Sequence, residues 1–201
     1  MSAPTVFLSA ATIDLKEWRD HLRDIFADAG IHVTVQDFSL GMAPRNVRDL
    51  LARCIDEADY VFHLAGMGYG SHATDAFPDQ PDFRCSWTQF EYYYAHRQGK
   101  PVFAAVLAPE LSAPEFIETG ADAADVALKA ELQKAHRLRV ESGKFTGTPV
   151  DQPGIDTRTL NRTVTTPLDL FKAIAGSLRH MRGLAEAAPQ LAAALETRLA
   201  L

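Results

Sequence analysis

A chain of 201 residues with 47% hydrophobic content can bury a substantial core, and this length favours a single domain with a short extension. Its formal net charge of −6 argues against a general nucleic-acid surface, because phosphate binding needs clustered lysines and arginines. The sequence shows no apolar run long enough to span a bilayer, no secretory signal pattern, and only two cysteines, which form no disulfide framework. We therefore expect a cytoplasmic protein that binds small molecules or proteins, and neither nucleic acid nor membranes.

The first elements alternate between strand and helix. The short apolar run over residues 5–9 predicts a buried first strand. We expect Asp14 to cap the following helix, with Glu17 at its third position and Gly30 at its end. Residues 31–35 alternate apolar and polar side chains, which predicts a half-covered strand at the edge of the sheet.

The middle of the chain predicts the centre of the sheet. The segment Asp37 to Arg45 contains glycine and proline and indicates an exposed loop before a helix that begins near Pro44. Residues 60–65 predict a buried central strand, which runs directly into glycines. The loop over residues 66–85 has no strong helix or strand signal, and long loops of this kind commonly line a site.

The stretch after this loop predicts a helix with both ends marked. Ser86 can cap it, Gln89 can complete a capping box, and Gly99 ends the helix about three turns later. Glu91 lies one turn inside this helix, where it and three aromatic residues fall at spacings of three and four on one face. The simplest interpretation is an acid at the edge of an apolar stripe, which supports the helix start. The aromatic residues are Trp87, Phe90 and Tyr94.

The remaining residues predict one more βα unit and a C-terminal extension. Residues 101–107 predict a fourth strand, 122–140 a helix, and 159–165 a fifth strand at an edge. Thr166 can cap a helix that begins at Pro167. We expect one domain over residues 1–183, and over 184–201 a further helix or the start of a linker to another domain beyond Leu201.

Strands that alternate with helices predict an α/β fold. We expect a flavodoxin-like three-layer sandwich around a parallel sheet of about five strands in the order 2-1-3-4-5. Ligands bind such sheets outside the carboxyl ends of the strands, where the strand order switches, here between the first and third strands. The residues at this rim are Ser9, Ala10, Thr12, Asp37, Gly66 and Gly68, with Glu91 and Trp87 on the adjoining helix.

Three segments carry a resemblance to a known family. The first strand, Val6-Phe7-Leu8-Ser9, the loop Asp37 to Arg45, and the motif Ser86-Trp87-Thr88-Gln89-Phe90-Glu91 together resemble TIR domains, especially bacterial TIR-like modules of defence and signalling proteins. The last motif is similar to the family pattern Ser-Trp-Cys-x-x-Glu, with Thr88 where cysteine is usual. The resemblance covers about residues 4 to 108.

The resemblance implies an activity. In enzymatic members the motif's glutamate cleaves NAD⁺, so Glu91 is the expected catalytic residue, with NAD⁺ as substrate and no further cofactor or metal. The expected substrate contacts are Ser9, Ala10, Thr12, Asp37, Gly66, Gly68 and Trp87. The loop Asp37 to Arg45 is expected to mediate self-association, which switches the activity on. The family's own nicotinamide and ribose contacts do not transfer, because the first strand lacks the aromatic and basic continuation of animal members and the 66–85 loop is unusually long.

The chemistry is consistent with a single acid. Cleaving the bond between ribose and nicotinamide expels a neutral base, so the leaving group needs no proton, unlike the alkoxide of ordinary glycoside hydrolysis. One carboxylate can hold the ribose hydroxyls and stabilise the oxocarbenium-like charge, or capture it covalently.

Other interpretations of these residues stay open at this point. Cys85 beside Ser86 could form a nucleophile site, but no partner for it is visible in the sequence. His63 lies in a buried strand and is most simply a hydrogen-bonded core residue. The glycines over residues 66–70 lack the spacing of a dinucleotide-binding loop. Besides an NAD⁺ hydrolase, the fold could serve a non-catalytic assembly module or an enzyme like a nucleoside deoxyribosyltransferase.

Overall fold

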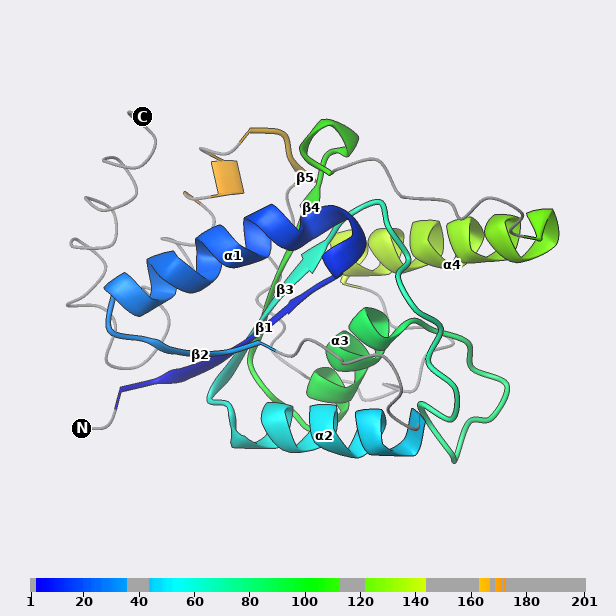
Figure 1. Ribbon diagram of the computed structural model, residues 1–201, viewed down its shortest axis with the longest axis horizontal. Coiled ribbons are helices and arrows are strands. Elements are labelled where there is room, and N and C mark those ends of the chain that lie inside the picture. The colour runs from blue at the N-terminus through cyan, green and yellow to red at the C-terminus, as the bar shows by residue number, and fades with distance from the viewer. Residues whose placement is uncertain are drawn as a thin grey trace.

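The protein is an α/β sandwich around one parallel sheet (Figure 1). The computed structural model describes residues 3–35, 44–112, 122–143, 163–166, 169, 170 and 172. The strands are β1 (Thr5–Ala10), β2 (His32–Thr34), β3 (Tyr60–Ala65), β4 (Val102–Leu107) and β5 (Thr163–Val164). They pair in parallel in the order β2-β1-β3-β4-β5. The predicted fold class and the order 2-1-3-4 are confirmed, and of the expected fifth strand the described residues show one two-residue pairing with β4.

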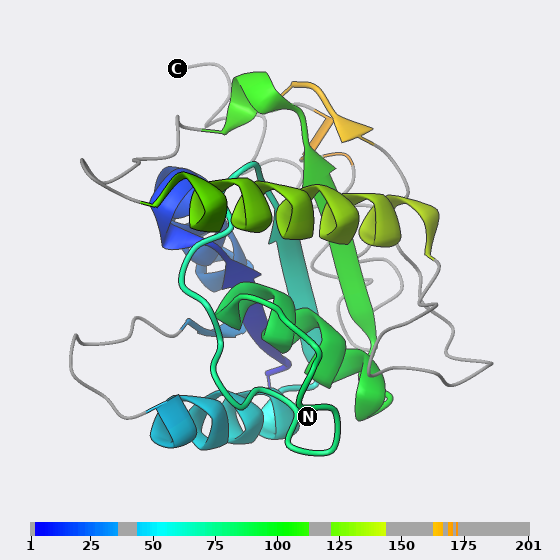
Figure 2. The ribbon, with the colours of Figure 1, turned by 90° about the vertical axis from the view of Figure 1, so that its right-hand side faces the viewer.

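Helices cover both faces of the sheet. They are α1 (Thr12–Asp28), α2 (Pro44–Glu57), α3 (Trp87–Arg97) and α4 (Ala123–Ser142), with a short 3₁₀ turn at Pro109–Leu111. Helix α1 lies on one face, and α2 and α3 lie on the other (Figure 1). Helix α4 packs against β3 and β4, and its Val140 belongs to the same apolar cluster as α3 (Figure 2).

Alternation along the strands divides the core into two clusters. Val6 and Leu8 pack under α1, whereas Phe7 packs under α2 and α3. Two residues beyond Phe7, Ser9 is directed to the same face as Phe7. The register pairs Ser9 with His63 on the neighbouring strand. The pleat therefore places two polar side chains next to each other on the face covered by α3 and α4.

The start of α1 differs from its prediction. The N-cap position is Ala11, which makes no side-chain cap, so the prediction of Asp14 as the cap is wrong. Asp14 is buried inside the first turn, and its Oδ2 accepts a hydrogen bond from the backbone N–H of Gly68 at 2.8 Å. This carboxylate is engaged by the loop after β3 and not by the first turn of its own helix.

The start of α3 agrees with its prediction. The Ser86 hydroxyl accepts from the backbone N–H of Gln89, and the Gln89 side-chain oxygen accepts from the backbone N–H of Ser86, each at 3.2 Å. Gly99 follows the helix with φ +68°, a conformation that favours glycine. The capping box fixes where α3 begins, and hence where Glu91 lies along it.

Several predictions fall outside the described residues. These are Asp37 with most of the loop that follows it, the helix expected from Pro167 apart from three of its residues, and the division between 1–183 and 184–201. Within the described part of the chain, no helix is both long and apolar enough to cross a membrane.

Candidate functional site

Glu91 is a buried acid at the carboxyl end of β1. It lies in the second turn of α3, and its exposed fraction is 6%. Burial raises the pKa of Glu91 to about 8, and its interaction with Ser9, near the end of β1, and the charge of Arg19 act in the opposite direction. The expected acid is therefore buried close to the end of β1, and burial favours its neutral form.

Arg19 brings a buried cation toward this acid from α1. It is 3% exposed and lies between the buried Leu15 and Leu22 at helical spacing. Arg19 is not among the site residues predicted from the sequence. A visible signal was present, because a buried apolar stripe that contains an arginine at a core position needs a partner of opposite charge.

A chain of buried polar side chains leads away from Glu91. The Ser9 hydroxyl lies 2.9 Å from His63 Nδ1, His63 Nε2 lies 3.0 Å from His136 Nε2, and His136 Nδ1 lies 3.0 Å from the Tyr93 hydroxyl. Burial lowers the pKa of His63 to about 3 and that of His136 well below its ordinary value. Both imidazoles are therefore neutral. The interpretation of His63 as a hydrogen-bonded core residue is confirmed.

His136 and Tyr93 were missed in the sequence. The stripe on α4 that faces the sheet is formed by Gln133, His136 and Val140, all buried and spaced by three and four residues. Two of these three residues are polar, so a search for apolar residues at helical spacing does not detect the buried side of α4. The signal available was a helical stripe of mixed polarity opposite a strand that itself contains a buried histidine.

The glycines after β3 pack tightly against α1. A side chain at Gly68 would come within 2.6 Å of Ile13 Cγ2 and 2.9 Å of Asp14 Oδ1, and one at Gly66 would collide with Asp14. Both glycines are buried. The backbone of both glycines does approach a neighbour closely, but among the described residues this neighbour is the first turn of α1, with the Asp14 carboxyl group next to both.

The other predicted contact residues differ in how open they are. Thr12 is exposed, Ala10 is buried, and Trp87 is half-buried and packs edge-on against Phe90 with ring centroids 5.8 Å apart. Asp37 lies outside the described residues. The structure thus brings Ser9 and Glu91 together and leaves Thr12 as the exposed member of the predicted set.

Helix α4 covers the end of β3 through polar contacts. The Gln133 amide donates to the Gly66 carbonyl at 2.8 Å, and its oxygen accepts from Gln89 at 2.8 Å. Arg137 donates to the carbonyls of Ala65 and Gly66 at 3.0 and 2.9 Å. Beneath these contacts lies a cavity of about 10 Å³ bordered by His63 and His136, roughly the space of one water molecule.

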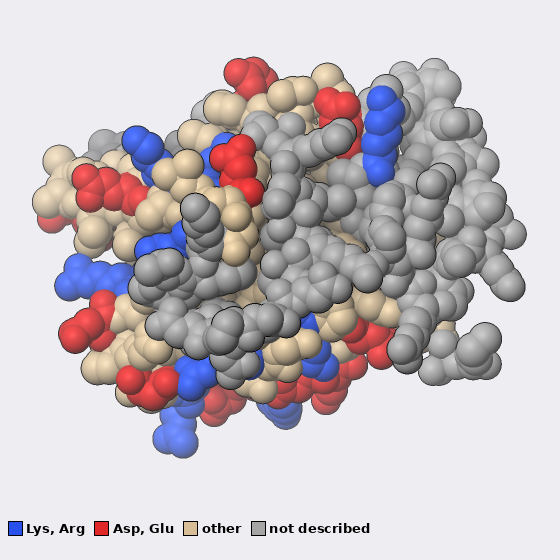
Figure 3. All heavy atoms as spheres, turned by 180° about the vertical axis from the view of Figure 1, so that it is seen from behind, with Lys and Arg blue, Asp and Glu red and all other residues tan. Residues whose placement is uncertain are grey.

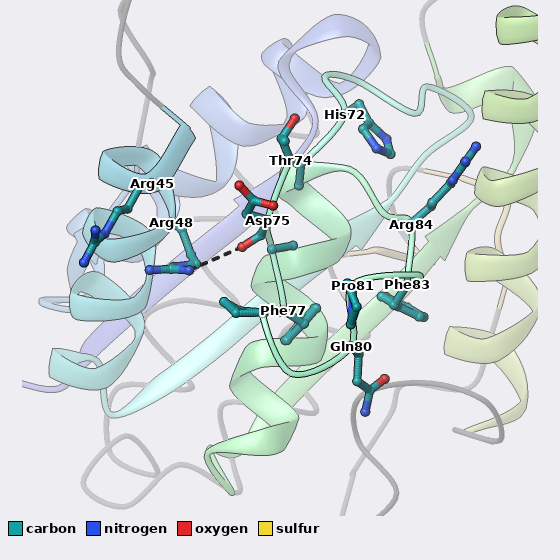
Figure 4. A pocket seen from close by; sticks show the side chains of 13 residues that line it. Arg45, Arg48, His72, Thr74, Asp75, Phe77, Gln80, Pro81, Phe83 and Arg84 are labelled. Carbon is teal, nitrogen blue, oxygen red and sulfur yellow. Dashed lines mark hydrogen bonds between the residues drawn. The ribbon is translucent and has the colours of Figure 1, made fainter.

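A larger pocket of about 580 Å³ lies elsewhere, between α2 and the loop before α3. Its arginines do not converge, because Arg45 and Arg84 point in opposite directions and Arg48 donates to the Asp75 carbonyl at 3.4 Å (Figure 4). Glu91 is not among its lining residues. Acidic and basic side chains of the described residues are also interspersed on the face shown in Figure 3. Neither this pocket nor the surface in Figure 3 places a cluster of like charges next to Glu91.

The nucleophile alternative gains no support. Burial raises the pKa of the Cys85 thiol to about 12, so it is not a thiolate, and Ser86 is engaged as the cap of α3. Among the described residues, no group of three histidine, cysteine, aspartate or glutamate side chains is arranged to hold a metal ion.

Comparison with known proteins identifies a family whose function is unknown. A search of curated proteins found no match, and neither did a search of solved structures. A family model described as "Domain of unknown function (DUF4062)" matches residues 5–142, which include β1 to α4 and every residue of the site above. Because this match covers more than half of the chain, the protein belongs to the DUF4062 family.

Proposed function

We propose that this protein cleaves NAD⁺ at the bond between nicotinamide and ribose, with Glu91 as the catalytic residue. The observation that carries the proposal is a buried carboxyl group on α3, near Ser9 at the carboxyl end of β1, whose pKa burial raises to about 8. Strand ends at the switch point of a parallel sheet are where such folds bind ligands. The resemblance of residues 86–91 to the TIR motif supplies the substrate.

The chemistry needs one carboxylate near the ribose. Nicotinamide leaves as a neutral base, so Glu91 stabilises the positive charge that develops on the ribose, and the dry surroundings strengthen this attraction. The charged pyridinium ring of NAD⁺ near Glu91 lowers the pKa of the carboxyl group by direct attraction. Binding of the substrate therefore favours the ionised form of Glu91 that the reaction uses.

Access to Glu91 requires the rim to open. With 6% of its surface exposed, Glu91 meets a ribose only after its neighbours move, and Thr12 and the half-buried Trp87 are the nearest predicted contacts with open surface. We expect self-association through the loop Asp37 to Arg45 to cause this opening, as the TIR resemblance implies. The expected products are nicotinamide and linear or cyclised ADP-ribose, and the expected setting is bacterial antiphage defence or immune-type signalling in the cytoplasm.

One observation favours a second candidate, a non-catalytic assembly module. Gly66 and Gly68 pack against Asp14, and Glu91 is almost fully covered. In that case Glu91 is a core residue and the protein releases no nicotinamide. The two candidates therefore differ in a directly measurable quantity.

The test is nicotinamide release from NAD⁺ by the wild type, Glu91→Gln and the matched control Glu57→Gln. Glu57 is exposed at the end of α2, so its replacement is expected to leave the rate unchanged. Loss of an electrostatic contact to the transition state typically costs about 100-fold or more in rate, which is the expected effect of Glu91→Gln. Equal release by all three proteins excludes Glu91 from the reaction. Turnover of deoxynucleosides in place of NAD⁺ would support a deoxyribosyltransferase.

A further inference from the structure

Helix α4 crosses β3 and β4 near their carboxyl ends (Figure 2). Its inner side is formed by Gln133, His136 and Val140, which are all buried. The half of the helix that precedes Gln133 extends beyond the sheet, and its side chains are exposed or half-buried (Figure 1). The helix therefore lies over the edge of the sheet at which folds of this kind bind ligands.

The attachment of α4 to the sheet is less apolar than that of α1. Helix α4 has 20 residues, and Val140 is its one buried apolar side chain. Helix α1 has 17 residues and buries Leu15, Leu22, Ile25 and Phe26. Apolar burial is the main source of docking free energy, whereas a buried hydrogen bond adds little because the same groups bond to water when exposed. We therefore expect α4 to detach from the sheet more easily than α1.

The polar contacts of α4 converge on the last residues of β3. The Gln133 amide donates to the Gly66 carbonyl at 2.8 Å, and its oxygen accepts from Gln89 at 2.8 Å. Arg137 donates to the carbonyls of Ala65 and Gly66 at 3.0 and 2.9 Å. Two side chains of α4 thus occupy the backbone groups that a ligand at the end of β3 would meet.

The space left under α4 is small. Its volume is about 10 Å³, and Ala11 at the start of α1 lines it together with Gln133 and His136. A space of this size holds about one water molecule and is too small for a ribose. A ligand reaches the end of β3 from this side only after α4 has moved.

We infer that α4 is a cap over a ligand site at the carboxyl end of β3, and that Gln133 and Arg137 hold this cap closed. In the closed form these two side chains take the place of the ligand. In the open form the carbonyls that they release accept hydrogen bonds from the ligand instead. The ligand and the closed cap therefore exclude each other.

The groups that opening releases define the class of ligand. They are the carbonyls of Ala65 and Gly66 and the side-chain amide of Gln89. The N–H groups of Met67 and Gly68 stay engaged by side chains outside α4. Because carbonyls only accept, the opened site favours a ligand with hydroxyl or amine donors over a bare phosphate. The hydroxyls of a ribose have this chemistry, and naming NAD⁺ as the ligand rests on the proposed function.

The first test measures whether α4 opens while the rest of the fold stays intact. Ala11→Cys places a thiol under the cap, and Val6→Cys places a matched thiol under α1, where Val6 is fully buried. We expect a thiol reagent to label the Ala11→Cys site at least about 10-fold faster, with each site resolved from Cys54 and Cys85 by mass spectrometry of peptides. Equal labelling rates at the two sites would mean that α4 leaves the sheet only on global unfolding, which overturns the inference.

The second test loosens the cap. Arg137→Met and Gln133→Leu each remove donors to the end of β3, and we expect each to speed labelling of Ala11→Cys about 10-fold, the effect of losing one buried hydrogen bond. Lys134→Met, on the exposed side of α4, is the matched control and leaves the labelling rate unchanged. Unchanged labelling in both test variants contradicts the role of these two side chains in holding the cap closed.

The third test concerns the ligand. If NAD⁺ binds only the open form, its apparent Kd falls by the same factor by which the open fraction rises. In a Glu91→Gln background, which prevents turnover, we therefore expect Arg137→Met to bind NAD⁺ about 10-fold more tightly and Lys134→Met to bind it unchanged, as measured by calorimetry. A variant that opens more easily but binds NAD⁺ equally or more weakly would remove the ligand site from under the cap.

The same series separates this inference from the proposed function. Failure of every protein in it to bind NAD⁺, with thiol labelling as expected, means that the proposed substrate is wrong and that α4 is still a cap. Release of nicotinamide by a wild type whose Ala11→Cys and Val6→Cys sites are labelled equally slowly means the reverse. The labelling experiments require no substrate and no enzymatic activity.

Discussion

The two faces of the sheet are built from the same strands but contain different chemistry. On the α1 face, Val6 and Leu8 join an apolar cluster with Leu22, Ile25 and Phe26. On the face under α3 and α4, alternate positions of β1 and β3 and the inner sides of the two helices place buried polar groups within the core. These groups are Ser9, His63, Gln89, Glu91, His96, Gln133 and His136.

The difference indicates that apolar and polar groups contribute differently to the two faces of the core. Apolar burial stabilises the fold in proportion to the area removed from water, whereas buried polar groups contribute little net stability and are costly when a partner is missing. Both faces therefore contribute stability through their apolar clusters. The α3 and α4 face in addition contains a network of buried hydrogen bonds between polar side chains.

The largest expected effect tests the α1 face. Phe26 is fully buried, and its ring meets Phe62 edge-on with centroids 5.6 Å apart. Phe26→Ala removes this contact and leaves a cavity, so we expect a loss of about 4 kcal/mol in the free energy of unfolding, measured by urea denaturation. Ile13→Ala on the exposed part of α1 is the control and is expected to cost less than about 1 kcal/mol. A loss below about 1 kcal/mol for Phe26→Ala would contradict the assignment of stability to this face.

The next effect has the opposite sign and concerns Glu91. Its pKa rises from 4.5 to about 8 on folding, so between these pH values the unfolded chain has released a proton that the folded protein keeps. Stability is therefore lost as the pH rises through this window and is constant above it. Glu91→Gln cannot titrate, and we expect it to gain stability relative to wild type across the window, on the order of 3 kcal/mol at its upper end.

Denaturation below, within and above this pH window measures that gain. Glu57→Gln, which removes an exposed acid, is expected to follow the wild type at every pH. A difference between Glu91→Gln and wild type that stays constant with pH would show that Glu91 has an ordinary pKa, and would remove the electrostatic contrast between the two faces.

Local signals in the sequence predicted the fold and the location of Glu91, but not the surroundings of Glu91. The capping box of Ser86 and Gln89 and the alternation of strands and helices depend on neighbours in sequence, and both are confirmed. The pairing of His63 with His136 spans 73 residues and depends on how α4 crosses the sheet. No periodicity in a single segment contains that information.

Asp14 shows the same limit within one helix. Its position before an apolar stripe predicts a helix cap. This prediction is wrong because it considers only the hydrogen-bond donors within the same helix. The long-range partner, the backbone N–H of Gly68, lies 54 residues away and takes the carboxylate as its acceptor. The Asp14 carboxylate could accept from the first turn of its own helix or from the loop after β3. The path of that loop decides between the two donors, and a single sequence does not specify this path.

The smallest expected effect tests this link between the two faces. Asp14 accepts from Gly68, and Arg137 on α4 donates to the carbonyls of Ala65 and Gly66. Burial lowers the pKa of Arg137, and the charges of Glu141 and Asp14 oppose this shift. Asp14→Asn keeps an acceptor oxygen but loses the charge, so we expect a loss of about 1 kcal/mol, and Asp14→Ala, which removes the acceptor, is expected to lose about 2 kcal/mol. Amide hydrogen exchange gives the sharper measurement, because the Gly68 N–H should lose protection in Asp14→Ala and retain part of it in Asp14→Asn. Equal protection of Gly68 in both variants and wild type would mean that the glycine loop holds its place without α1, and that the two faces are coupled through the sheet alone.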